Sequence, residues 1–155
     1  MFERFTKAAR ETVTEASLIA RDMGAMTIEA EHLLLAVTNS PSPAAGVLHD
    51  AGLDDDGLRA ALAAETARSL AAVGVGVGVG VEGLQFSPFV NTPRFGQSAK
   101  LALERALKVA LARNDRHIGS THLTLAVLQP SVGTVPRALD GAGVDRARLI
   151  SALSA

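Results

Sequence analysis

The stretch of sequence that determines the fold is Thr27-Ile28-Glu29-Ala30-Glu31-His32-Leu33-Leu34-Leu35-Ala36-Val37. It returns as His117-Ile118-Gly119-Ser120-Thr121-His122-Leu123-Thr124-Leu125-Ala126-Val127, so that each residue of the second copy stands 90 positions after its counterpart. In both copies a polar loop that carries an isoleucine leads into an apolar segment that starts at a histidine. A repeat of this kind indicates a duplicated structural unit.

The segments before the two copies also repeat. Apolar residues follow a three-and-four spacing that predicts a helix over residues 3–23, at Phe5, Ala9, Val13, Ala16, Ile19, Ala20 and Met23. The same face returns in a helix predicted over residues 95–113, at Phe95, Ala99, Leu103, Ala106, Val109 and Ala110. Residues 30–38, which follow the first of these segments, also predict a helix. It is apolar on nearly every side and therefore central. In its second copy we expect Ser120 to be the N-cap, a role that Ala30 cannot fill in the first copy.

Two further helices follow each copy. Residues 44–50 predict a short helix, and the acidic residues Asp54, Asp55 and Asp56 favour the start of another, which turns Leu58, Ala61, Leu62 and Ala64 inward. After one extra loop residue, Ala142-Gly143-Val144-Asp145 repeats Ala51-Gly52-Leu53-Asp54, and Leu149 and Leu153 repeat Leu58 and Leu62. The sequence therefore predicts an all-α domain over residues 1–155, with eight helices in two four-helix repeats, 1–68 and 92–155, related by a pseudo-twofold axis.

A Gly/Val-rich segment lies between the two predicted repeats. Residues 69–91 contain alternating glycine and valine from Val73 to Val81, which has no helix propensity and a high backbone entropy. We interpret the segment as a mobile linker or a loose surface loop. The alternation of valine leaves an edge strand open as the alternative.

Composition excludes several classes of function. Apolar residues make up 48% of the 155 residues and aromatic residues only 3%, which favours packed helices over a β-sandwich. The net charge of −1 gives no reason to expect nucleic acid or an anionic membrane as a partner. Because cysteine is absent, disulfides and thiolate metal sites are excluded. Nothing resembles a signal peptide or a membrane span, so we expect a cytoplasmic protein.

No motif indicates catalysis, a cofactor or a metal. The glycines of residues 78–83 fit a dinucleotide-binding pattern, but no strand-helix-strand alternation surrounds them, and no Gly-Lys pair of a phosphate-binding loop exists. His117 and His122 are poorly spaced to share a metal, and we expect His32 and His122 to make structural hydrogen bonds at helix starts. There is no nucleophile elbow. We therefore expect a protein that is not an enzyme and that carries no cofactor.

One cluster of residues is a candidate binding groove. Under the repeat, Phe95 is the counterpart of Phe5 and Lys100 of Arg10, so the pseudo-twofold axis would bring aromatic rings and cations together. Spacing alone favours an ordinary interpretation, with buried rings and solvated cations. Phe2 fits that interpretation less well, because it precedes the helix and has less core to enter.

These features together resemble a known family. The opening Met1-Phe2-Glu3-Arg4-Phe5-Thr6, the segment Glu31-His32-Leu33-Leu34 and the helical repeat are similar to the N-terminal domain of Clp ATPases, especially the ClpC type. The resemblance covers almost the whole chain. It implies an all-helical double repeat that, in the family, is joined to AAA+ rings, docks adaptors and protein substrates, and binds certain cyclic peptide antibiotics. Because this chain ends where the rings would begin, it resembles a free-standing version.

The resemblance also assigns roles to residues. It places Phe2, Phe5, Arg10, Val13, Phe95 and Lys100 in the groove that takes cyclic peptide antibiotics. It implies a phosphoarginine pocket at Thr6 and Glu31, where the carboxylate would take the guanidinium. The second such pocket has Gly96 and Thr121 at the matching positions, which leaves at most one phosphoarginine site.

Two functions remain open after this comparison. The first is a non-catalytic module of the Clp chaperone-protease system that binds protein substrates or adaptors, some of them phosphoarginine-marked, and acts with Clp unfoldase or peptidase components. The second is a sequestering protein that binds cyclic peptide antibiotics directed against ClpC-type ATPases. The first predicts a protein partner, and the second predicts tight binding of the peptide alone.

Overall fold

The repeat produces two matching sets of helices in the computed structural model, which describes residues 2–74 and 92–155. The first set is α1 (Lys7–Asp22), α2 (Ala30–Thr38), α3 (Pro43–Asp50) and α4 (Asp55–Ala72). The second set is α5 (Gln97–Ala112), α6 (Ser120–Leu128), α7 (Thr134–Gly141) and α8 (Arg146–Ser154). The described part of the chain thus has eight helices, and the predicted all-α double repeat is confirmed.

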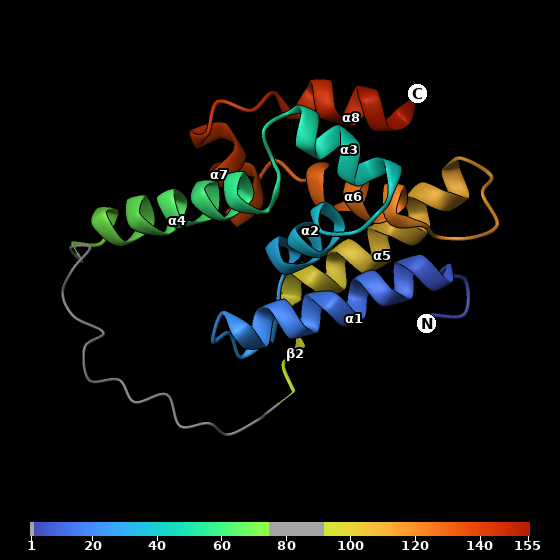
Figure 1. Cartoon of the computed structure of the whole chain (residues 1–155), viewed down its shortest axis with the longest axis horizontal. Helices are drawn as coiled ribbons and strands as arrows, with labels where there is room; N and C mark the ends of the chain where they lie inside the picture. The colour runs from blue at the N-terminus through green and yellow to red at the C-terminus, as the bar shows by residue number, and fades with distance from the viewer. Residues whose placement is uncertain (1, 75–91) are drawn as a thin grey trace.

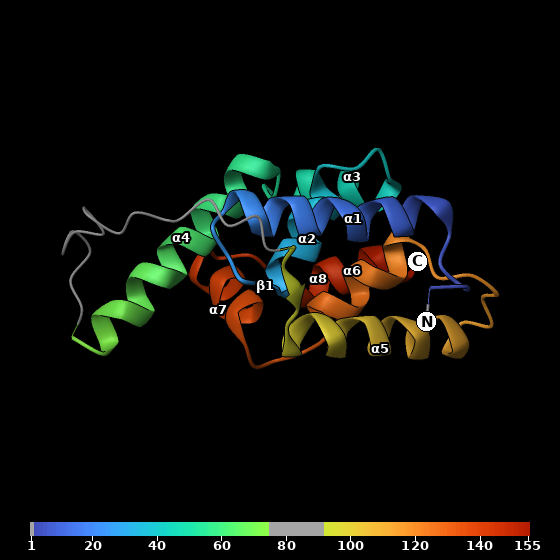
Figure 2. The ribbon, with the colours of Figure 1, turned by 90° about the horizontal axis from the view of Figure 1, so that it is seen from below.

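The apolar second helix of each repeat forms the centre of the core. α2 and α6 contact each other, and α1 packs on α2 as α5 packs on α6. In Figure 1, α1 and α5 lie on one side of this central pair, and α3 and α8 lie on the other. Figure 2 shows the same arrangement from below, where α1 and α5 run in similar directions and the central helices are visible between them. Leu33, Leu34, Leu123 and Leu128 are fully buried, in agreement with the prediction that this segment is central.

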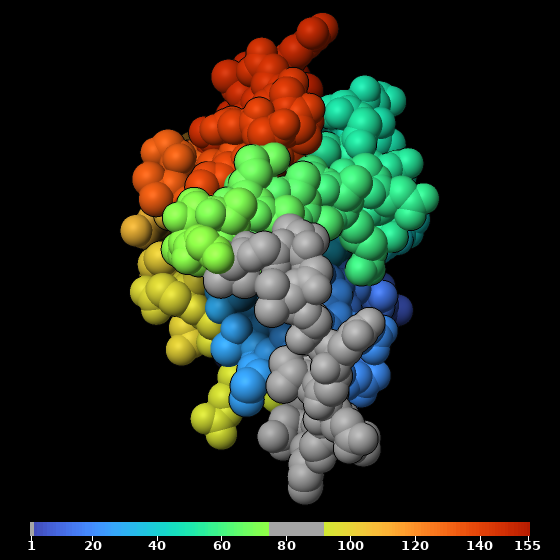
Figure 3. Space-filling model, turned by 90° about the vertical axis from the view of Figure 1, so that its left-hand side faces the viewer, coloured from blue at the N-terminus to red at the C-terminus, as the bar shows by residue number. Residues whose placement is uncertain are grey.

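α4 packs against α7 of the other repeat. It covers the end of the molecule shown in Figure 3, between α3 and α7. Leu58, Ala61 and Leu62 are buried as expected, but Ala64 is exposed, and its neighbour Glu65 is buried instead. Glu65 is drawn inward because it accepts hydrogen bonds from Arg137 (2.7 Å) of α7 and from Ser69 (2.7 Å).

Several predicted helix boundaries were wrong for local reasons. α1 begins at Lys7 and not at residue 3, because Thr6 is its N-cap and accepts a hydrogen bond from the N–H of Ala9 (3.0 Å). Met23, predicted on the inward face, lies beyond the helix end and is 46% exposed. Phe95 precedes α5, because it belongs to the short strand β2 (Arg94–Phe95), so the helix starts only at Gln97.

The prediction that Ser120 caps α6 was also wrong. The N-cap is Gly119, and Ser120 is the first residue of the helix. The ring of His122 is bonded instead, since its Nδ1 accepts the N–H of Gly119 at 2.9 Å. In α2 the N-cap is Glu29, whose N–H donates to Nδ1 of His32 at 2.8 Å. The expected structural hydrogen bonds of both histidines at helix starts are therefore confirmed.

The predicted linker of residues 69–91 falls mostly outside the described residues. α4 continues through its first four residues to Ala72, and residues 75–91 lie outside the described part of the chain. The two interpretations of the Gly/Val alternation stay predictions.

Candidate functional site

The two repeats are joined by strand pairs that each cross from one repeat to the other. β1 (Thr27–Ile28) runs parallel to β2, with Ile28 opposite Phe95, and an isolated bridge pairs Phe5 with Ile118. These pairs are equivalent, because Phe95 and Ile118 stand 90 positions after Phe5 and Ile28. Their hydrogen bonds match as well, since Thr6 donates to Ile118 at 3.0 Å and Gly96 donates to Ile28 at 2.8 Å. The exchange places the start of each repeat against the middle of the other.

This exchange brings three aromatic rings together. Phe2 folds back in a turn in which its carbonyl accepts the N–H of Phe5 at 3.1 Å. The Phe2 ring meets the Phe5 ring edge-on at a centroid distance of 5.1 Å, and it lies 6.2 Å from the Phe95 ring. Such distances are typical of stabilising aromatic pairs. Phe5 is 4% exposed and forms the base of the cluster, whereas Phe2 and Phe95 are half-buried.

A cavity of about 390 Å³ opens beside Phe2 and Phe95. We call it the aromatic groove, lined by Phe2, Arg10, Val13, Thr14, Ser17, Ile28, Thr92, Pro93 and Phe95. Its walls are mainly apolar, and Arg10, exposed on α1, is the single cation among the lining residues. A volume of this size matches the usual range for sites that take small molecules or short peptide segments.

The structure brings most of the predicted groove residues to this cavity. Phe2, Arg10, Val13 and Phe95 line it, and Phe5 supports the Phe2 ring from beneath. Lys100 is exposed on α5 and is not among the lining residues.

Sequence analysis missed other lining residues. Thr14 and Ser17 stand four positions after Arg10 and Val13, so helical spacing could have identified them. Thr92 and Pro93 gave no signal, because only the strand pairing with the first repeat brings them to α1.

The predicted phosphoarginine residues do not line a common cavity. Glu31 borders a cavity of about 200 Å³ together with Ser98, Leu101 and Arg105 of the second repeat, and Thr6 is not among its lining residues. Burial raises the pKa of the half-buried Glu31 carboxyl, and the nearby Glu29 adds to the increase. Thr6 caps α1, and its backbone is bonded to Ile118. Because the repeats exchange strands, residues near Thr6 meet the start of α6, and residues near Gly96 meet the start of α2.

Glu29 explains the glycine at position 96. Its carboxylate accepts hydrogen bonds from the N–H of Ser98 (3.1 Å), from the Ser98 hydroxyl, and from the Thr27 hydroxyl (2.9 Å). A Cβ at Gly96 would overlap this carboxyl group. Gly96 is therefore the residue that lets a carboxylate of the first repeat cap α5, where Thr6 performs the same task for α1 with its own side chain.

The environment of Glu29 stabilises its charge. Although partial burial raises the pKa of this carboxyl, the hydrogen bonds from Ser98 and Thr27 outweigh burial and hold the pKa below its ordinary value. Glu29 is therefore ionised at neutral pH, and its negative charge at the start of α5 complements the helix dipole.

The described residues include no group of three or more His, Asp or Glu side chains that could hold a metal ion. None of the described helices combines the length and the apolar character needed to cross a bilayer.

The double repeat and its exchanged strands correspond to a known domain family. A profile of the Clp repeat (R) N-terminal domain matches residues 4–88 and 94–155. The chain belongs to the Clp repeat N-terminal domain family. The two matched ranges correspond to the two repeats of this Clp repeat domain.

Relatives of this Clp repeat domain include much longer proteins. An uncharacterised protein of Mycobacterium tuberculosis is 31% identical over 148 residues, which cover 95% of this chain and 51% of the relative. The chloroplast chaperone ClpC1 of Oryza sativa subsp. japonica is 32% identical over 146 residues, which cover 94% of this chain and 14% of the relative. The chain thus spans about half or less of the length of these relatives.

Solved structures share the fold. The N-terminal domain of the chaperone ClpD from Arabidopsis thaliana superposes with a TM-score of 0.70 at 18% identity, covering 99% of this chain and 94% of that one. The Hsp104 N-terminal domain from Candida albicans gives a TM-score of 0.67 at 17% identity, covering 97% of this chain and 89% of that one. The Clp repeat architecture is thus retained at low sequence identity.

Proposed function

We propose that this protein is a non-catalytic binding domain that captures protein substrates or adaptors of a Clp system through the aromatic groove. The observation that carries the proposal is that the half-buried rings of Phe2 and Phe95, 6.2 Å apart, both line an apolar cavity of about 390 Å³. Membership of the Clp repeat family supports the same function.

The groove has the properties expected of a site for apolar peptide side chains. Aromatic anchors beside a pocket contribute most of the binding energy in many interfaces, and a neighbouring arginine adds a donor for main-chain carbonyls. The buried Phe5 ring contacts the Phe2 ring at a centroid distance of 5.1 Å, so Phe2 is already positioned before a ligand arrives. A site that is preorganised in this way loses little conformational entropy on binding.

The test uses fluorescein-labelled β-casein, an unfolded protein, in a fluorescence anisotropy titration. Phe2 is already partly buried, so its truncation in Phe2→Ala removes about 1 kcal/mol of contact, which corresponds to about fivefold weaker binding. Met26→Ala serves as the matched control, because Met26 is 84% exposed and lies outside the groove. Equal affinity of wild type and Phe2→Ala would remove the groove from the proposed function.

A second candidate function is sequestration of cyclic peptide antibiotics that target ClpC-type ATPases. The groove volume of about 390 Å³ suits an apolar side chain of a small macrocycle, and Arg10 stands at its edge. Calorimetric titration with such a peptide separates the two functions. Sequestration requires tight binding of the peptide and no binding of unfolded protein, whereas a substrate-binding domain takes both in competition.

Capture of phosphoarginine-marked proteins is part of the first proposal at Glu31. This half-buried carboxylate faces a cavity and has the chemistry to bind a guanidinium group. Titration with an arginine-phosphorylated protein, with its unphosphorylated form as control, tests this role. Binding that Glu31→Ala abolishes would support it, and the absence of heat would exclude it.

A further inference from the structure

Two more cavities occupy equivalent positions in the two repeats. The α1–α6 pocket is bordered by Ala8, Glu11 and Glu15 of α1 and by the start of α6, and it has a volume of about 540 Å³. The α5–α2 pocket is the cavity of about 200 Å³ that contains Glu31, bordered by Ser98 and Arg105 of α5 and by the start of α2. Ser98 and Arg105 stand 90 positions after Ala8 and Glu15.

The α5–α2 pocket satisfies its own polar groups. The N–H of Ala30, the first residue of α2, donates to the Ser98 hydroxyl at 2.9 Å. Ser98 is in turn bonded through its N–H to the Glu29 carboxylate at 3.1 Å. The start of α2 is thus capped by the Ser98 side chain, and the start of α5 is capped by the Glu29 side chain.

The α1–α6 pocket lacks both of these capping groups. Ala8 stands where Ser98 would be needed, and Gly119 stands at the position of Glu29. The first N–H groups of a helix have no acceptor within the helix, so those of Ser120 and Thr121 are available at the pocket wall.

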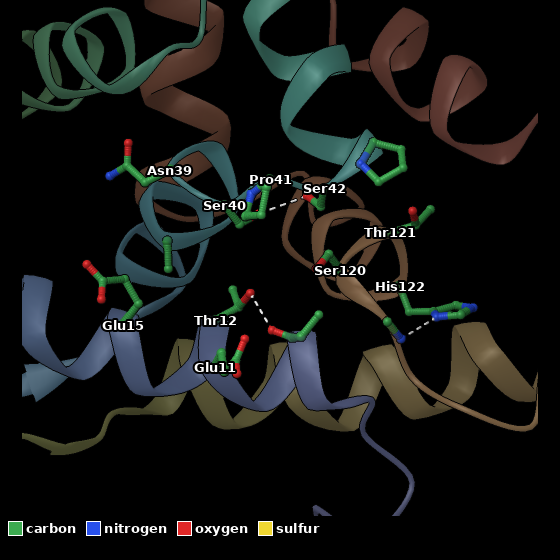
Figure 4. A pocket seen from close by; sticks show the side chains of 14 residues that line it. Glu11, Thr12, Glu15, Asn39, Ser40, Pro41, Ser42, Ser120, Thr121 and His122 are labelled. Atoms are coloured by element: carbon green, nitrogen blue, oxygen red, sulfur yellow. Dashed lines mark hydrogen bonds between the residues drawn. The ribbon is translucent and has the colours of Figure 1, made fainter.

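Ser120 provides a second, independent indication of a ligand. Its side chain is only 8% exposed, and its hydroxyl makes no hydrogen bond with any other described residue. Figure 4 shows Ser120 on the wall of the pocket, between Ser42 and Thr12, with its oxygen directed away from α6. A hydroxyl on a pocket wall with no partner among the described residues is free to donate a hydrogen bond to a ligand.

The charge of the pocket selects the kind of ligand. Glu11 and Glu15 border it on the α1 side, where Figure 4 shows both, and its lining contains no lysine or arginine. Glu11 is loosely paired with Lys7 at 3.8 Å, and both side chains are largely exposed. Two carboxylates without a balancing cation in the lining attract a positive charge and repel a dianion.

We propose that the α1–α6 pocket binds an unmodified lysine or arginine side chain of an extended segment of a partner protein. The cation faces Glu11 and Glu15, and a main-chain carbonyl of the segment accepts hydrogen bonds from the Ser120 hydroxyl and from the free N–H groups of α6. The inference rests on the proposed protein-binding function and adds to it a second contact with its own specificity for basic segments.

The test is an anisotropy titration with a fluorescein-labelled peptide of alternating alanine and lysine, against matched peptides with glutamine or glutamate in place of lysine. The lysine peptide is expected to bind at least fivefold more tightly than the glutamine peptide. The double variant Glu11→Gln, Glu15→Gln should remove this preference, and Ser120→Ala should weaken binding about threefold. Glu104→Gln is the matched control, because Glu104 is an exposed α5 glutamate outside both pockets and should bind like wild type.

Several results would overturn the inference. These are equal binding of the three peptides, an unchanged affinity in the double glutamine variant, or an equal loss in Glu104→Gln. In the Glu31→Ala variant, tighter binding of a peptide with phosphorylated arginine than of its unmodified form would also contradict it, since the phosphate adds negative charge beside Glu11 and Glu15. The result is independent of the aromatic groove, because Phe2→Ala should leave the lysine peptide unaffected while weakening β-casein.

Discussion

The contact between Glu29 and Gly96 leads to a prediction about how the two repeats are coupled. In Gly96→Thr the new Cβ overlaps the Glu29 carboxyl group and displaces it from Ser98. Hydrogen bonds to a charged acceptor contribute about 1.5–3 kcal/mol when shielded from water, and we take about 1 kcal/mol each for a half-buried carboxylate. Loss of the two bonds from Ser98 should therefore lower the free energy of unfolding by about 2 kcal/mol, which corresponds to about 4–8 °C in Tm for a chain of this size.

The reciprocal change should restore the cap in another form. Glu29→Gly alone also removes the carboxylate from α5 and should cost about 2 kcal/mol. The double variant has threonine at position 96 and glycine at position 29, the residue types that the other repeat has at the matching positions Thr6 and Gly119, and the new threonine can cap α5 as Thr6 caps α1. An N-cap threonine contributes about 1 kcal/mol. The double variant should therefore lose only about 1 kcal/mol, which is about 3 kcal/mol less than the sum of the two single effects.

Urea unfolding followed by circular dichroism measures all four proteins of this cycle. The reasoning requires a coupling energy well above about 0.5 kcal/mol, the usual deviation for independent sites. Additive losses within that margin would refute the claim that position 96 is glycine because of Glu29. A stable Gly96→Thr single variant would refute it more directly.

Two further predictions concern other parts of the fold. The pKa of Glu65 is lowered chiefly by the hydrogen bond from Arg137 and by that from Ser69, so its contribution to stability is complete above the unfolded value of about 4.3 and is lost as the pH falls through the folded value. Urea unfolding should show a gap between wild type and Glu65→Gln at pH 7 that shrinks in acid, and a constant gap would contradict this. Leu123→Ala, in the fully buried face of α6, should cost about 2–5 kcal/mol, while Leu111→Ala on the exposed face of α5 should stay within about 0.5 kcal/mol of wild type. Equal losses in these two variants would show that α6 is not the centre of the core.

The architecture was predictable because both repeats show the same helical spacing of apolar residues, which is a local property of the sequence. The spacing of Ala9, Val13 and Ala16 determines a helical face, and the same pattern 90 positions later determines its partner. The aromatic groove was predictable in part, because Phe2 and Phe95 belong to segments that the pseudo-twofold axis brings together. Lys100 was included in the predicted groove as the counterpart of Arg10 and through the family resemblance, but neither a shared position in the repeat nor a resemblance ensures that a residue lines the same cavity.

The features that sequence reasoning missed depend on contacts between distant residues. The carboxylate of Glu29 caps a helix that begins 68 residues later, and no local pattern connects it with Ser98. For the same reason Gly96 was interpreted as the loss of a binding residue, although in the structure it makes room for that carboxylate. The cap of α6 was assigned to Ser120 by residue preference, whereas the bond from Gly119 to His122 made a capping hydroxyl unnecessary.

The exchanged strand pairs have a consequence for how the chain folds during translation. Ile28 finds its strand partner only at Phe95, and Phe5 finds its partner only at Ile118. While the ribosome is still adding the second repeat, the first has its helices but lacks both of these partners. Such contacts between distant residues are slow to form. The nascent first half therefore leaves the exit tunnel with unpaired backbone and an uncovered Phe5 ring, the features that chaperones recognise, and it reaches its native state only when the last third of the chain has emerged.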